Sequence, residues 1–321
     1  MMTLTRVLQE ASEHAASAAS HGAEAIQHGA EQTAAHGAAG GGPDIGGMLM
    51  HHLADANYLE LPFLGEVHLP HWEPIHLAGL TIDFSPTKHV VFMLLAAILV
   101  AIMGILVSRA ITGKYRGRAP SGFSNALEAM ILYFRDEIVR RNIGHGADAF
   151  TPFILTLFFF ILGMNLLGLV PWGASPTGNI MVTGALAVVS LIVIEVSGFL
   201  ALGPGGYAKT IFYAPKGLPP IGQALMLLIM TPVEFLGKLT KPFALMVRLF
   251  ANMTAGHTII FSLIGLIFVF GNFVGVRWGV AVGAVGMSLA MMLLEIFVAF
   301  LQAYIFAMLT SVFIGLIRHA H

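Results

Sequence analysis

The sequence of 321 residues contains no cysteine and very little charge. Without cysteine the chain can form neither a disulfide nor a thiol-based active site. Charged residues make up 10% of the chain and hydrophobic residues 57%, a balance outside the range of soluble globular domains. The apolar runs are long and continuous rather than alternating ten-residue strands, which argues against an outer-membrane barrel. Together these features indicate an all-α integral membrane protein.

The few charges are distributed unevenly along the chain. Residues 1–87 contain ten acidic residues and one base, whereas residues 109–141 contain seven bases and three acids. Because loops rich in Lys and Arg remain on the cytoplasmic side, we expect the N-terminus outside and the first loop inside. Five crossings would then leave the C-terminus in the cytoplasm.

The chain divides into two predicted parts, an extracytoplasmic extension with an interfacial loop over residues 1–85 and a membrane domain over residues 86–321. Four histidines recur in the extension at intervals of seven or eight: His14, His21, His28 and His36. On a helix this spacing aligns the imidazoles in one stripe. Two interpretations remain, a metal- or pH-sensing arm and, favoured by the composition, an Ala-rich extension without such a role.

We expect five crossings and one surface helix. The crossings are residues 90–107, 150–170, 180–202, 221–270 and 279–317, and the surface helix is residues 125–141. This last segment spaces its apolar residues as in a helix and places its charges elsewhere, which predicts an amphipathic helix on the cytoplasmic face. The second and third crossings form a hairpin, because prolines and glycines interrupt the short segment between them.

The last two apolar runs are too long to cross the membrane upright. As helices they would measure ~75 Å and ~58 Å, against a hydrocarbon core of ~30 Å. Either both are broken, with Pro232 and Pro242 as the candidate break points, or they form a strongly tilted helical hairpin. A tilted hairpin would present one long face to a partner in the same bilayer.

Several ionisable residues lie inside these apolar runs. Arg248 is deep in the fourth run, where an arginine costs ~2.5–3.5 kcal/mol on insertion scales, so it predicts a functional site. Glu195 in the third crossing could line an aqueous path or pair with a polar partner. Lys238 and Lys241 are interpreted as interfacial or snorkelling residues.

Helical geometry groups the polar residues of the last two runs. Arg248 and Asn252 share a face, while Glu295 and Gln302 form a stripe with ~10 Å between them. If the two helices pair antiparallel, His257 lies near Glu295 and Arg248 lies near Gln302. The histidine and glutamate could transfer protons or could simply be a buried pair that holds two helices together.

Two motifs in these runs resemble subunit a of the membrane sector of F-type ATP synthases. They are KPFALMVRLFANMTAGH at residues 241–257 and LEIFVAFLQAYIFAMLTSVFIG at residues 294–315. The resemblance extends over roughly residues 85–317, because it also includes KHVVF at 88–92, MNLLGLVP at 164–171 and PTGN at 176–179.

The resemblance implies a stator subunit with two offset proton half-channels that meet a rotating ring of c subunits. Arg248 matches the essential arginine of the family, with Asn252 and Gln302 as its polar neighbours. His257 and Glu295 match the polar pair of the outward-facing half-channel, in the exchanged order found in mitochondrial and related bacterial members.

Two further intramembrane positions bear on the same path. Glu195 is expected to belong to the proton path, because it is a carboxylate inside a predicted crossing. Gly168 stands where some members carry an acid, so no acid is expected there.

The implied protein is a non-catalytic subunit of a proton-translocating complex, without a cofactor or metal and without a nucleic-acid partner. Its partners would be the c-subunit ring, the b subunits of the peripheral stalk, the rest of the ATP synthase and membrane lipid. A bacterial inner membrane is the expected location, ahead of the mitochondrial one. Two other classes were weighed: an ion-coupled secondary transporter, disfavoured because no duplicated half is visible, and a structural membrane anchor, which would not need these charges.

Overall fold

The computed structural model describes residues 56–61, 65–71, 75–77, 80–82, 85–109, 122–170, 173–212, 219–270 and 275–319. These residues belong to two compact units. One contains the described part of Thr258–Met291, and the other contains the described parts of Asp55–His257 and Met292–His321. The histidine-spaced segment at residues 14–36 lies outside the described residues.

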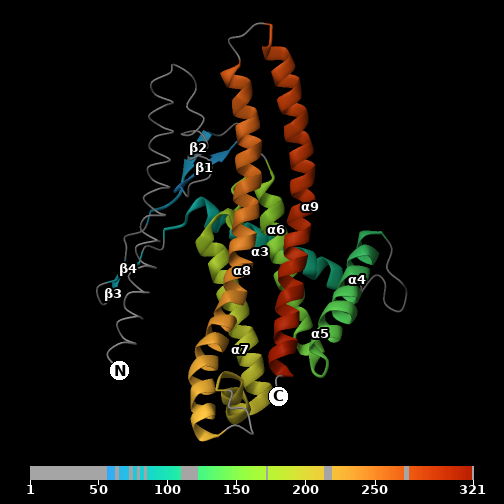
Figure 1. Cartoon of the computed structure of the whole chain (residues 1–321). Helices are drawn as coiled ribbons and strands as arrows, with labels where there is room; N and C mark the ends of the chain where they lie inside the picture. Colours follow the sequence, from blue (N-terminus) through green and yellow to red (C-terminus); the bar gives the residue numbers. More distant parts are fainter. Residues whose placement is uncertain are drawn as a thin grey trace, which may run out of the picture. The chain divides into compact units, whose positions relative to one another are not determined.

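Five helices are long and apolar enough to cross a membrane. They confirm the expected all-α membrane class, and each overlaps one of the five expected crossings (Figure 1). Their bounds are Lys88–Arg109 (α3), Thr151–Gly168 (α6), Ile180–Ile211 (α7), Pro220–Val269 (α8) and Arg277–Arg318 (α9).

Short strands precede the first crossing, where the sequence had indicated only an interfacial loop. Strand β1 (Tyr58–Leu61) pairs antiparallel with β2 (Gly65–His68), and β3 (Ile75–Leu77) pairs with β4 (Leu80–Ile82). The strands are three or four residues long, and this length is too short for an alternating pattern to distinguish a strand from a loop.

The amphipathic segment forms three consecutive helical pieces: α4 (Phe123–Tyr133), a π-helical turn η2 (Phe134–Arg140) and α5 (Arg141–Ile143). Most of its charged residues are exposed, and several pair with one another, as in the 2.9 Å contact between Arg140 and Asp136. The hydrogen bond from Arg135 lowers the pKa of Asp136 below its usual value, although desolvation opposes this shift. The predicted separation of charged and apolar residues is therefore present.

Helices α6 and α7 are joined by a short turn that contains the 3-10 helix η4 (Pro176–Gly178). Asn179 caps α7, because its side chain accepts a hydrogen bond from the backbone N–H of Met181 at 2.9 Å. Helix α7 continues past the predicted end at residue 202, through a non-helical Gly203 and Pro204, to Ile211. Lys209 is consequently helical rather than part of a loop.

Helix α8 is one continuous helix of 50 residues that contains both Pro232 and Pro242. Of the two expected alternatives, breaks at these prolines are therefore wrong. Membrane helices tolerate internal proline because neighbouring groups can satisfy the freed backbone atoms. The tilt of α8 and α9 (42 residues) in a bilayer stays a prediction.

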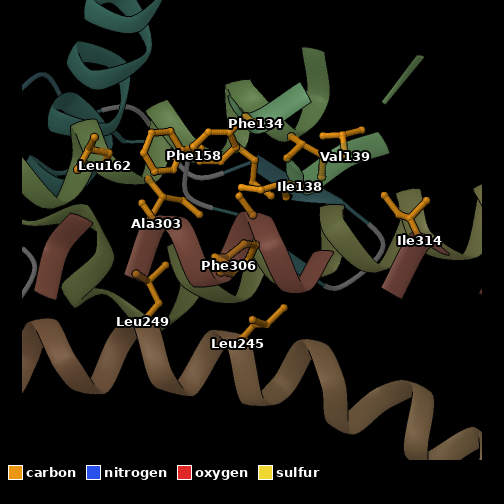
Figure 2. Packing of buried hydrophobic residues seen from close by; sticks show 14 of the residues in the cluster. Phe134, Ile138, Val139, Phe158, Leu162, Leu245, Leu249, Ala303, Phe306 and Ile314 are labelled. Carbon is orange, nitrogen blue, oxygen red and sulfur yellow. The ribbon is translucent and has the colours of Figure 1, made fainter. Parts of the chain in front are cut away.

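The core of the larger unit lies where α9 packs between α8 and the segments α6 and η2. Figure 2 shows Ala303 and Phe306 of α9 between Leu245 and Leu249 on one side and Phe158 on the other. All of these residues are at most 5% exposed.

Small residues allow the helices of this unit to approach closely. Ala299, Ala303 and Ala307 recur every fourth residue on the buried face of α9. A Cβ atom added to Gly315 would come within 2.0 Å of the carbonyl oxygen of Asn142, so only glycine fits there. The position of the last part of α9 is thereby set by backbone contact with the surface helix.

Candidate functional site in the paired long helices

His257 of α8 and Glu295 of α9 lie in contact, as the antiparallel arrangement of the two helices had predicted. The imidazole Nδ1 is 2.9 Å from Glu295 Oε1. The glutamate side chain is only 4% exposed and the histidine side chain 16%. A carboxylate and an imidazole thus meet within an apolar helix pair, 38 residues apart in the sequence.

Two carbonyl oxygens also hold the His257 ring. Nδ1 lies 3.0 Å from the carbonyl of Met253, one turn earlier in α8, and Nε2 lies 3.0 Å from the carbonyl of Gly168 in α6. A neutral imidazole can donate at one nitrogen only, whereas an imidazolium donates at both. The carbonyls of Met253 and Gly168 can therefore accept hydrogen bonds from both nitrogens when the ring is charged.

The Glu295 carboxylate is poorly satisfied. Among the described residues, neither of its oxygens receives a hydrogen bond of good geometry, although His257 is at ion-pair distance. Buried polar groups in folded proteins are nearly always hydrogen-bonded, and exceptions concentrate at functional sites. The carboxylate thus lies within proton-transfer distance of His257.

Gly256 makes the close approach of Glu295 possible. A Cβ atom at this position would lie 2.5 Å from Glu295 Oε1 and 2.7 Å from its carboxyl carbon. The residue beside His257 must therefore lack a side chain for the carboxylate to reach the imidazole.

A buried polar network supports the carbonyl that His257 contacts. Asn165, 1% exposed, donates to the carbonyl of Ala299 at 3.2 Å and accepts from the Thr177 hydroxyl at 2.7 Å. Ser175 continues the chain of contacts to Thr177 at 3.0 Å. These bonds tie α6 to η4 and α9, and so fix the segment that ends at Gly168.

Arg248 is exposed, although it lies on a helix that is apolar enough to span a membrane. The neighbouring Leu245 and Leu249 are each 2% exposed and point into the core. Within the part of the chain that the structure describes, Arg248 makes no ion pair. Its guanidinium is therefore available to a group outside this chain.

The other two predicted polar neighbours of Arg248 differ in burial. Asn252 is half-buried and Gln302 is 7% exposed on α9. Their proximity to Arg248 and their roles stay predictions.

Comparison with known proteins identifies the family. Residues 90–315 match the family described as ATP synthase A chain. The chain belongs to this family. It is 45% identical over 267 residues to the ATP synthase subunit a of Chloroherpeton thalassium, covering 83% of this chain and 75% of the relative.

Two further relatives are similar to this chain to nearly the same degree. The ATP synthase subunit a 2 of Chlorobaculum tepidum is 43% identical over 272 residues, with 84% of this chain and 72% of the relative covered. The ATP synthase subunit a of Anaeromyxobacter dehalogenans is 43% identical over 305 residues, with 89% and 76% covered. The region that matches the family, residues 90–315, contains all the site residues described above.

Glu195 has a charged partner that the sequence did not predict. Lys238 Nζ lies 3.1 Å from Glu195 Oε2, with the lysine side chain 13% exposed and the glutamate 23%. Lys238 is thus paired and largely buried, and its position relative to the membrane interface stays a prediction. Both residues also line a cavity of about 240 Å³. Glu195 therefore pairs with a polar partner and also borders a cavity, so the two interpretations of this residue are compatible.

The buried network around Asn165 was also missed as part of the site. An asparagine between apolar residues of a membrane helix is a usable signal, because a buried amide needs partners. Its partners could not be read from the sequence, since Ala299 lies 134 residues away.

Proposed function

We propose that this chain is the stator proton-channel subunit of a rotary ATP synthase. It carries protons through two offset half-channels to and from the carboxylates of a c-subunit ring, and their passage drives rotation and ATP synthesis. The observation that carries this proposal is that Arg248 is exposed on an apolar helix and makes no ion pair with the residues that the structure describes. Intramembrane charges pair with one another, so the matching carboxylate belongs to another subunit.

Arg248 acts as a fixed positive charge that each ring carboxylate passes. A guanidinium stays protonated at every relevant pH. At ~4 Å and an effective dielectric constant of ~20, its attraction to a carboxylate is ~4 kcal/mol, which favours the ionised form without holding it irreversibly. A proton therefore cannot stay on the carboxylate as it passes from one half-channel to the other, and leakage is prevented.

His257 and Glu295 carry protons in the outward-facing half-channel. Their 2.9 Å separation permits direct transfer, and the carbonyl of Gly168 and that of Met253 stabilise the ring when both nitrogens are protonated. Asn252 and Gln302 supply polar groups near Arg248. Glu195 lies in the wall of the inner half of the path, where it borders the 240 Å³ cavity.

The N-terminus lies outside and the C-terminus in the cytoplasm of a bacterial inner membrane, in accord with the excess of bases in residues 109–141. The exposed apolar face of α8, which includes Phe243 (59% exposed) and Val247 (37%), packs against the c ring. The b subunits of the peripheral stalk hold the chain stationary.

Replacement of Arg248 tests this function in inverted membrane vesicles. We expect Arg248→Ala to abolish ATP-driven proton pumping and ATP synthesis, because the ring carboxylate loses its partner. The complex should still assemble, since Arg248 is exposed. Pumping is followed with a pH-sensitive dye, and assembly by co-purification of the c subunit and the soluble ATPase.

Arg141→Ala is the matched control, because Arg141 is an arginine on the surface helix with 76% of its side chain exposed. It should pump at the normal rate. Normal coupled pumping by an assembled Arg248→Ala complex would contradict the mechanism.

A further inference from the structure

Helix α7 changes direction at Gly203, which adopts φ 68° and ψ 172° inside the helix. Pro204 follows and has no N–H group to continue the hydrogen-bond ladder. The kink separates Glu195, before it, from Tyr207, after it.

A contact between these two residues bridges the kink. In a straight helix, residues twelve apart are separated by ~18 Å along the axis. The Tyr207 hydroxyl nevertheless donates a hydrogen bond to Glu195 Oε2. Only the change of direction at Gly203 brings the two side chains within reach.

Lys238 of α8 completes the cluster. Its ammonium donates to the same oxygen, Glu195 Oε2, at 3.1 Å, and it lies 4.5 Å from the centroid of the Tyr207 ring. One carboxylate oxygen therefore accepts hydrogen bonds from the far side of the kink and from a second helix.

This cluster is a principal attachment of the first part of α8. Between residues 222 and 241 no described residue of this helix is buried, and large apolar side chains such as Leu228 are as much as 63% exposed. Burial begins at Pro242. Directional polar contacts, rather than core packing, locate this part of the helix against α7.

The cluster also borders the cavity of about 240 Å³, which has room for several water molecules. Glu234 and Lys241 lie on the same wall. Water in this cavity can conduct protons without using Glu195 as a carrier, while the glutamate and Lys238 neutralise each other's charge.

We propose that Glu195, Tyr207 and Lys238 form a clamp that fixes the kink of α7 against α8, and that Glu195 serves the inner half-channel as the countercharge of Lys238 rather than as a proton carrier. The second part of this inference rests on the proposed function. The first part, the clamp, does not depend on the proposed function.

The charge role is tested with paired variants in the assembled complex. Glu195→Gln should slow ATP-driven pumping about tenfold, because it leaves an uncompensated ammonium beside the proton path. The double variant Glu195→Gln/Lys238→Gln removes both charges and keeps two amides able to hydrogen-bond. It should recover to within about twofold of the unmodified rate, since neither charge of the Glu195–Lys238 pair is then left without its partner.

A proton-carrying glutamate gives the opposite result, because its loss is not repaired by removing Lys238. A double variant as slow as Glu195→Gln, or a single variant with full activity, overturns the charge role. The matched control is Glu137→Gln with and without Arg141→Gln, an exposed pair at 3.2 Å on the surface helix, which should have no effect.

The clamp is tested by a distance measurement that does not depend on proton transport. Since the chain has no cysteine, spin labels can be attached uniquely through Ile192→Cys and Phe212→Cys, both 54% exposed and on opposite sides of the kink. The distance distribution should broaden when Tyr207→Phe or Glu195→Gln is added and stay unchanged with Glu137→Gln. An unchanged distribution in all variants overturns the clamp, whatever the outcome of the pumping assay.

Discussion

Gly256→Ala probes the His257–Glu295 contact without altering either residue. The new methyl carbon would lie 2.5 Å from Glu295 Oε1, whereas ordinary contacts begin at 3.4 Å. The carboxylate must therefore retreat by about 0.9 Å, which follows from the difference between these two distances. Movement directly away from the imidazole would raise its distance from that ring from 2.9 Å to at most roughly 3.8 Å.

The size of the effect follows from Coulomb's law. At an effective dielectric constant of ~20, this separation weakens the attraction by about 1 kcal/mol, which corresponds to a five- to tenfold change in an equilibrium constant. We expect ATP-driven pumping to slow by about this factor, because the proton then passes between less closely held groups. The contacts of His257 with Gly168 and Met253 should remain.

Gly237→Ala is the matched control on the same helix, because a Cβ atom there would meet nothing within 4 Å. In a helix interior, alanine is favoured over glycine by roughly 0.8–1.0 kcal/mol, so this variant should be assembled and fully active. The reasoning is refuted if Gly256→Ala pumps as fast as Gly237→Ala in equal amounts of assembled complex.

Two further variants test the packing that supports the site. Asn165→Leu should lower the stability of the subunit by about 1–3 kcal/mol, because it leaves buried hydrogen-bonding partners unsatisfied; thermal unfolding in detergent measures this, and an unchanged midpoint would contradict it. Gly315→Ala should prevent stable assembly, because the new carbon would lie 2.0 Å from the backbone oxygen of Asn142; normal amounts of this variant in the purified complex would show that the contact can relax.

The sequence predicted those features that depend on residue spacing within an element. The five apolar runs and the amphipathic segment follow from hydrophobic periodicity. The His257–Glu295 contact follows from the antiparallel order of two long helices, and the structure confirms it at 2.9 Å.

Where a feature depends on tertiary contacts, the sequence either did not predict it or predicted it wrongly. Pro232 and Pro242 were candidate break points, yet α8 continues through both, because proline affects a membrane helix according to its neighbours. Likewise, α7 passes Gly203 and continues to Ile211. The partner of Lys238 lies 43 residues away on another helix, so no local pattern identifies it.

The alanines on the buried face of α9 have a mechanical consequence. In the proposed function, a rotor that pulls on Arg248 exerts force on α8, and the stator must resist that force without bending. Ala299, Ala303 and Ala307 are at most 3% exposed, so α9 approaches its neighbours closely along three successive turns. Because densely packed interiors have low compressibility, a load on α8 passes through this ridge to α6 and to the surface helix rather than being lost in deformation. In the proposed function, these three buried alanines therefore help the subunit to resist the force of the rotor.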